Sequence, residues 1–185
     1  MDEKLLSVFS AQVRFQCEYV LLAHERIRAA LREIESRSTP PLRKGYGAQV
    51  ALWAGVQDLL NAAANIAKAF WGQGGTRAVE RSTLRASFEV KDASPLKNVL
   101  MRNNFEHFDE RLDKWWNNSP TRGYLDMATG PAITTRTGDP LDAFRTLDTN
   151  TLEITFWGEP FSLAEIVGEA QRLLSVLDGR LRDQS

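Results

Sequence analysis

The sequence of 185 residues has few of the features that mark secreted, membrane-spanning or metal-binding proteins. Its single cysteine, Cys17, excludes an internal disulfide and is typical of a reducing compartment. No apolar run approaches the ~20 residues of a membrane-spanning helix, and the N-terminus Met-Asp-Glu-Lys lacks a signal-peptide pattern. We therefore expect a cytoplasmic protein without a membrane partner.

An excess of charge of one sign is also missing. The 23 Lys and Arg residues nearly balance the 24 Asp and Glu residues, for a net charge of −1. No overall field therefore attracts nucleic acid, and any RNA contact requires local basic patches. With 43% apolar and 25% charged residues, the composition is ordinary for a soluble globular protein. The length is typical of a single domain over 1–185.

Glycine and proline are absent from residues 4–37, where apolar residues recur at three- and four-residue steps or their multiples. This pattern predicts one long amphipathic helix, buried through Leu5, Phe9, Val13, Val20, Ile27, Leu31 and Ile34. Ser38-Thr39-Pro40-Pro41 would end it, because proline cannot continue a helix. Cys17 lies within this apolar pattern, which predicts a buried structural thiol.

Four further helices are predicted, over 48–71, 77–88, 95–117 and 162–182. Gly72-Gln73-Gly74-Gly75 ends the first of them and is interpreted as a helix cap, because no strand precedes it and no Gly-Lys-Ser/Thr follows. Ser94 with Pro95, and Ser162 with Glu165, are start signals for the last two.

Residues 118–160 interrupt the helical pattern. An irregular connection over 118–141 is rich in Gly, Pro, Thr and Asp. The segments 143–147 and 152–157 then predict a β-hairpin, closed by Gly158-Glu159-Pro160. We therefore expect an all-α fold: an antiparallel bundle of four long helices and one short one, with a β-hairpin inserted before the last helix.

Polar residues are concentrated in 100–113, between large apolar residues. On a helix, Asn103 and His107 would continue the face of Leu96, Val99 and Leu100, and the roughly opposite side would hold Phe105, Phe108, Leu112, Trp115 and Trp116. Arg102, Glu106 and Asp113 would form a third stripe between these two sides. A surface helix has one apolar face, so this pattern predicts a buried or half-buried polar site.

The spacing Arg102-Asn103-x-x-x-His107 resembles the signature of HEPN domains, an Arg with a His four to six positions later. The resemblance covers one motif and the all-helical frame around it. It implies a metal-independent ribonuclease that acts as a homodimer, with two copies of the motif meeting at the interface and no cofactor. It also implies a role as a toxin or phage-defence effector, with an antitoxin protein as a further expected partner.

Carried over by motif position, Arg102 would bind the scissile phosphate and His107 would act as general acid or base. Asn103 would position phosphate or water. The cleaved RNA would carry a 2′,3′-cyclic phosphate. Arg102 and His107 are five residues apart and would point about 140° away from each other on an ideal helix. A symmetric partner that supplies the second set of residues would meet this objection.

Weaker candidates for substrate contact lie around the motif. Glu106, one turn from Arg102, is most simply an ion-pair partner of Arg102, which would lower activity if it held the guanidinium away from substrate. Arg77, Arg81 and Arg85 recur at four-residue steps and form either an exposed face or a phosphate-facing ladder. Asn61 and Asn65, one turn apart, would support the site or form a packed seam between helices.

Two other interpretations stay open. Arg102–Glu106 pairing, with Asn103 and His107 bonded to a neighbouring helix, would give a catalytically inactive helical bundle that binds a nucleotide or a protein partner. The carboxylates around His107 (Glu106, Asp109, Glu110 and Asp113) are a weak metal hypothesis, because the Glu-x-x-His pairs used in helical bundles are missing. We therefore predict no metal site. His24 is interpreted as a histidine at the edge of the core.

Overall fold

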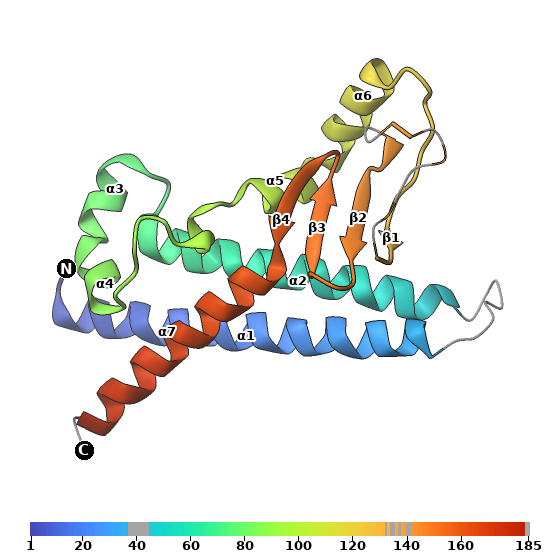
Figure 1. Ribbon diagram of the computed structural model, residues 1–185. Helices are drawn as coiled ribbons and strands as arrows, with labels where there is room; N and C mark the ends of the chain where they lie inside the picture. The colour runs from blue at the N-terminus through green and yellow to red at the C-terminus, as the bar shows by residue number, and fades with distance from the viewer. Residues whose placement is uncertain (37–44, 132, 134–135, 137, 140–141, 184–185) are drawn as a thin grey trace.

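Two long helices form the base of the molecule (Figure 1). α1 (Glu3–Glu35) and α2 (Gly45–Trp71) lie side by side and run in opposite directions. The computed structural model describes residues 1–36, 45–131, 133, 136, 138–139 and 142–183. The other elements are α3 (Gly75–Glu80), α4 (Ser82–Ser87), the 3-10 turn η1 (Pro95–Lys97), α5 (Leu100–Glu106), α6 (Phe108–Asn118), β1 (Ala128–Thr129), β2 (Arg145–Asp148), β3 (Glu153–Phe156), β4 (Glu159–Ser162) and α7 (Leu163–Asp183).

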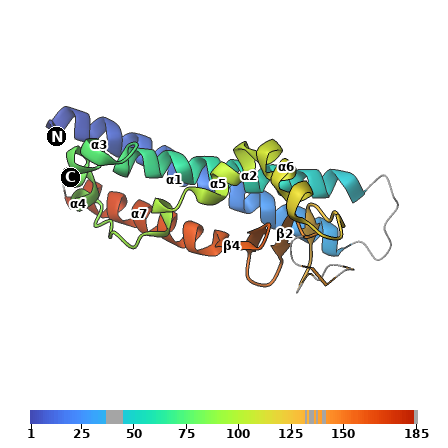
Figure 2. The same cartoon turned by 90° about the horizontal axis from the view of Figure 1, so that it is seen from above.

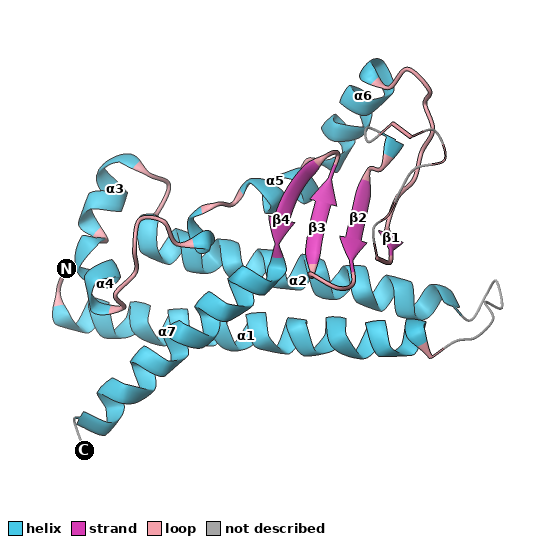
Figure 3. Cartoon of the chain, viewed as in Figure 1, coloured by secondary structure: helices cyan, strands magenta, loops and turns pink. Residues whose placement is uncertain are grey.

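Helices dominate the fold, and a small sheet stands on one half of α2 (Figure 3). α7 crosses α1 and α2, and both termini lie at the same end of the molecule (Figures 1 and 2). The helical class predicted from the sequence is therefore confirmed. None of the helices in the described part of the chain combines the length and the apolarity that a membrane span requires.

Side-chain caps mark the starts of α1 and α7. The Asp2 carboxylate accepts hydrogen bonds from the backbone N–H groups of Lys4 and Leu5, at 3.0 and 3.2 Å, and so caps α1. The Ser162 hydroxyl accepts from the N–H of Glu165 at 3.2 Å, which confirms the predicted start of α7. The expected stop at Ser38–Pro41 lies outside the described residues.

Two of the expected helices are divided. The helix expected over 77–88 is α3 and α4, separated at Arg81. The third of the four expected long helices, over 95–117, consists of η1, α5 and α6. The described chain thus has three long helices and several short ones, in place of the expected four long helices and one short one.

α1 and α2 approach each other closely at Gly55. A Cβ atom at this position would lie 2.9 Å from Cγ1 of Ile27 and 3.4 Å from the carbonyl oxygen of Ala23. Ile27 and Ala23 are both buried. The missing side chain at Gly55 therefore allows the two helices to pack at this distance. Further along α2, the small side chains of Ala62 and Ala63 are buried as well.

The predicted β-hairpin is present but belongs to a larger sheet. β2 pairs antiparallel with β3, with Asp148 opposite Glu153, and the strand order is β1-β2-β3-β4. We expected Gly158-Glu159-Pro160 to close the hairpin, which is wrong. Trp157 and Gly158 have φ values of 48° and 81° and turn the chain tightly into β4, which pairs antiparallel with β3.

α2 holds the sheet through polar and aromatic contacts. The indole N–H of Trp53 donates to the carbonyl oxygen of Met127 at 3.0 Å, next to the short parallel strand β1. Phe105 of α5 stacks on Trp53 with the ring centroids 6.3 Å apart, and lies 5.5 Å from the ring of Phe156 in β3. Phe144 continues this row of rings at 4.8 Å from Phe156. The aromatic row therefore joins α2, α5 and the sheet.

A largely buried ion pair organises the connection that precedes the sheet. Nε and Nη2 of Arg145 donate to the two carboxylate oxygens of Asp126 at 2.7 and 2.5 Å. The two side chains are only 20% and 16% exposed. This bidentate geometry satisfies both charges and fixes residue 126 against β2.

We predict that Gly55→Val lowers the free energy of unfolding by about 1–3 kcal/mol, because the added side chain overpacks against Ile27. Gly168→Ala is the matched control, because a Cβ atom at this exposed position of α7 meets nothing within 4 Å. It should raise the free energy of unfolding by about 0.5–1 kcal/mol through helix propensity. Urea unfolding followed by circular dichroism measures both, and a Gly55→Val protein as stable as wild type contradicts the close approach.

We also predict that Arg145→Met lowers the free energy of unfolding by about 2–3 kcal/mol, because the Asp126 carboxylate loses its partner in a poorly solvated position. Arg26→Met is the control, since its pair with Asp58 is 3.2 Å long and more than half exposed on both sides. Its removal should cost less than about 1 kcal/mol. Equal losses in the two variants, measured by urea unfolding, would contradict the role given to Arg145.

Candidate functional site

The polar segment identified from the sequence folds as two helices that meet at His107. α5 ends at Glu106, His107 has φ −100° and ψ 40°, and α6 begins at Phe108. The segment was expected to become helical at residue 95, but α5 begins at Leu100. The side-chain oxygen of Asn98 accepts a hydrogen bond from the N–H of Leu100 at 3.0 Å, at the first residue of α5.

Ser94 does not act as the expected cap. Its hydroxyl donates to the carboxylate of Glu169 in α7 at 3.0 Å. Nε of Arg172 donates to the same carboxylate at 2.7 Å. The pKa of Glu169 is lower than its ordinary value, mainly because of the hydrogen bond from Arg172.

The break at His107 changes which large side chains are buried. Phe105 and Trp115 lie in the core, as expected. Phe108 and Trp116, expected on the same apolar side, are about half exposed. Both exposed rings belong to α6, so part of the aromatic surface of this helix faces outward.

Arg102 is held within its own helix. Its Nη1 atom forms an ion pair with the Glu106 carboxylate and also donates to the side-chain oxygen of Asn103 at 3.3 Å. The Arg102 side chain is 21% exposed, and its Nε atom is buried without a hydrogen-bond partner in the described part of the chain. The guanidinium therefore has unused donor capacity, while Glu106 neutralises part of its charge.

Arg102 and Asn103 line a pocket of about 340 Å³ between α5 and the C-terminal part of α2, which we call the Arg102 pocket. Lys68 of α2 and Lys97 of η1 also line it, so three of its lining residues are cationic. The remaining lining residues are Ala64, Ala67, Trp71, Gly72, Gln73, Gly74 and Val99. No carboxylate is among these described lining residues, so the pocket suits an anionic ligand.

Lys68 and Lys97 were not identified from the sequence. Lys97 is five residues before Arg102, and an exposed contact at 3.8 Å joins its Nζ to Asp92. Lys68 lies on a different helix, 34 positions before Arg102 in the chain. No local spacing links these residues, and the packing of η1 and α5 on α2 brings them together.

His107 does not line the Arg102 pocket. Its side chain is 54% exposed, and its Nδ1 atom lies 3.6 Å from the carboxylate of Glu110, one turn along α6. Within one chain, Arg102 and Asn103 therefore lie in the same pocket, whereas His107 lies outside it at the C-terminal end of α5. Glu106 lies between them and lines a second hollow with Gln57, Phe105, Phe108 and Arg145.

The weaker candidates lie elsewhere and are separately engaged. Arg77 pairs with Glu80 at 3.0 Å. Arg85 donates to two backbone carbonyls, and the Arg81 guanidinium lies 3.9 Å from the ring centroid of Phe9. The three side chains therefore do not face one ligand, because the division between α3 and α4 gives each a different surrounding.

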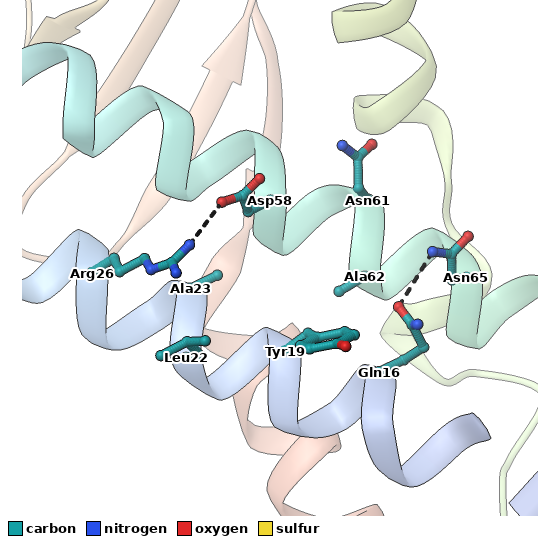
Figure 4. A pocket seen from close by; sticks show the side chains of 9 residues that line it. All are labelled: Gln16, Tyr19, Leu22, Ala23, Arg26, Asp58, Asn61, Ala62 and Asn65. Atoms are coloured by element: carbon teal, nitrogen blue, oxygen red, sulfur yellow. Dashed lines mark hydrogen bonds and ion pairs between the residues drawn. The ribbon is translucent and has the colours of Figure 1, made fainter. Parts of the chain in front are cut away.

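Asn61 and Asn65 line a pocket of about 330 Å³ between α1 and α2 (Figure 4). The amide of Asn65 donates to Gln16 of α1 at 3.3 Å, whereas Asn61 points away from α1. Neither residue lines the Arg102 pocket.

A buried amide missed in the sequence positions the α5–α6 corner. Asn104 is 2% exposed, donates to the Glu159 carboxylate at 2.9 Å and accepts from Nε of Arg111 at 2.9 Å. It thereby joins α5 to β4 and to α6. The motif pointed to its neighbour Asn103. Nothing in the sequence indicates that Asn104 would be the buried amide of the two.

No group of three or more His, Cys, Asp and Glu side chains within the described ranges could hold a metal ion. The chain matches no family model, no curated protein and no solved structure.

We predict that the Arg102 pocket binds inorganic pyrophosphate and that Lys68→Met and Lys97→Met each weaken this binding about five- to tenfold. One charged contact contributes about 1–1.4 kcal/mol to binding, and its loss lowers the affinity by this five- to tenfold factor. Lys91→Met is the control, because Lys91 is exposed and does not line the pocket. Calorimetric titration at low ionic strength measures the affinities, and equal losses for Lys91→Met and Lys97→Met would mean that the pocket is not the site.

Proposed function

We propose that this protein is a HEPN-like, metal-independent endoribonuclease that acts as a homodimer. The supporting observation is the Arg102 pocket: two adjacent residues of the motif share a hollow with Lys68 and Lys97, and none of the described lining residues carries a carboxylate. Three cations in one hollow suit the phosphate groups of RNA, which the net charge of −1 would not attract.

In the proposed reaction the ribose 2′-oxygen attacks the adjacent phosphorus, and the bond from phosphorus to the 5′-oxygen of the next nucleotide breaks. A base removes the 2′-hydroxyl proton, and an acid gives a proton to the leaving 5′-oxygen. The products are a 2′,3′-cyclic phosphate and a 5′-hydroxyl. Arg102 stabilises the charge on the pentavalent phosphorus, and Asn103 orients the phosphate.

His107 supplies one of the two proton transfers from the second copy of the chain. Within one chain it does not line the Arg102 pocket, so a composite site is needed. His107 is half exposed and lies at the corner between two helices, where it is accessible to a partner. An imidazole suits proton transfer near neutral pH.

Glu106 keeps the proposed site in a resting state. Its carboxylate already pairs with Arg102, so a phosphate must compete for the same guanidinium. Low activity until RNA displaces Glu106 fits the proposed biological role, a cytoplasmic toxin or phage-defence effector held by an antitoxin protein.

A second candidate function is phosphate or nucleotide binding without catalysis. It is favoured by the Arg102–Glu106 ion pair together with the position of His107 outside the pocket. This function needs Lys68, Lys97 and Arg102 but makes no use of His107. Substitution of His107 therefore separates the two candidates.

We expect wild-type protein to cleave single-stranded RNA in the presence of EDTA, and Arg102→Ala and His107→Ala to reduce the rate at least about 100-fold. His24→Ala is the matched control, because His24 lies on α1 and should keep full activity. Glu106→Gln should raise the rate several-fold, since Arg102 loses its competing carboxylate. RNA that binds but remains intact would support the binding function and reject the nuclease.

Mixing the two inactive variants tests the composite site. After subunit exchange, a dimer of Arg102→Ala with His107→Ala holds one intact site, made of Arg102 from one chain and His107 from the other. Random exchange should therefore restore about a quarter of the wild-type rate. No recovery, with exchange verified by mass, would show that both residues act within one chain.

A further inference from the structure

We propose that α1 is the interface through which two copies of this chain associate, as an antiparallel pair of helices related by a twofold axis near Phe15. This proposal goes beyond the nuclease function, because it names the surface of association and does not depend on RNA. It is carried by a row of exposed side chains that the bundle leaves uncovered.

Five large apolar side chains on α1 are 44–55% exposed. They are Leu5, Val8, Phe15, Tyr19 and Leu22. Together with the exposed Gln12 and Arg26, they recur at alternating steps of three and four residues, from 5 to 26. We call these seven residues the α1 stripe.

The α1 stripe repeats every 3.5 residues on average, which is the period of a coiled-coil seam. It covers 5–26, a length of about 32 Å at 1.5 Å per residue. The opposite side of α1 is already buried in the core, through residues such as Val13, Val20 and Ile27. A helix with one buried face and a second apolar stripe fits packing against another helix.

The side chains of the α1 stripe are complementary to themselves when the second copy runs antiparallel. A twofold axis at Phe15 sets Phe15 against its own copy and Val8 against Leu22. Gln12 then lies opposite Tyr19, where an amide and a phenol can form a hydrogen bond. Phe15, Val8 and Leu22 thus meet apolar partners, and the Gln12 amide meets the hydroxyl group of Tyr19.

Charges at the edge of the stripe favour the same direction. In the antiparallel pair, Lys4 lies opposite Glu25 at the edge of the stripe. In a parallel pair, Arg26 would lie against its own copy, and like charges across such a seam are unfavourable. Charge complementarity therefore selects the antiparallel arrangement.

A groove beside the stripe can accept side chains of the second copy. The pocket between α1 and α2 in Figure 4 is lined by Tyr19, Leu22 and Arg26 of the stripe and by Asp58 and Asn61 of α2. In this view α7 lies behind α1 and α2, and Tyr19 and Leu22 are 55% and 50% exposed. The second helix thus meets a hollowed surface two helices wide.

The twofold axis lies at the level of the Arg102 pocket along the bundle. Gln16, next to Phe15, bonds to Asn65 of α2 at 3.3 Å. Ala64 and Lys68, within a turn of Asn65, line the Arg102 pocket. Association through the α1 stripe therefore places the two Arg102 pockets at the same position along the bundle, one on each side of the twofold axis.

Sedimentation equilibrium of the full chain tests the association. We expect wild type to be a dimer at micromolar concentration, and the double substitution Phe15→Glu with Tyr19→Glu to weaken the dimer more than 100-fold, because four carboxylates would meet at its centre. Val79→Glu, at a 71% exposed position on α3, is the control and should remain dimeric. A monomeric wild type, or a dimer that persists in the double variant, overturns the proposal.

Disulfide trapping tests the direction and the register, with variants that leave the fold intact because the replaced side chains are exposed. Phe15→Cys should give a covalent dimer on mild oxidation, whereas Val8→Cys alone should not, and Val8→Cys with Leu22→Cys should do so again. The native Cys17 does not interfere, since it is buried and burial raises its pKa to about 12. Equal trapping through Val8→Cys and Phe15→Cys overturns the antiparallel register.

These measurements use no RNA, so they fail or succeed independently of the nuclease function. A dimer through the α1 stripe that leaves RNA intact removes the proposed function and keeps this inference. RNA cleavage by a chain that sediments as a monomer removes this inference and the composite site.

Discussion

The close packing of α1 on α2 is the constraint on which the rest of the structure depends. Gly55 lets the two backbones approach at Ile27, and each helix then has only part of its surface left for other contacts. α2 uses Trp53 to hold Phe105 and the sheet, and uses Ala64 and Lys68 further along to line the Arg102 pocket. The position of the candidate site is therefore a consequence of how α2 is oriented against α1.

Local electrostatics at the Arg102 pocket differ from those of the whole chain. The net charge is −1, yet three cationic residues line one hollow whose described lining carries no carboxylate. Glu106 opposes them from the edge, because it pairs with Arg102 at the i, i+4 spacing within α5. Any anion that enters the pocket must therefore compete with a carboxylate that the same short helix supplies.

The sequence predicted features whose causes are local. The start of α7 follows from the Ser162 cap and from apolar periodicity, and the hairpin follows from two short strands with a turn between them. The break at His107 was not predictable from periodicity, because apolar residues continue on both sides of it. Leu5 was expected in the core, yet it lies in the exposed α1 stripe, since periodicity does not say which of two apolar stripes is covered.

By itself, the sequence determined the helical class, the long helices at both ends of the chain and the motif residues Arg102, Asn103 and His107, because spacing and capping act within a few turns. Only the tertiary structure decided that Lys68 and Lys97 join Arg102 and Asn103 while His107 stays outside their pocket. The physical reason is that pocket composition depends on which helix faces pack together. That choice depends on contacts between residues far apart in the chain, which local spacing does not encode.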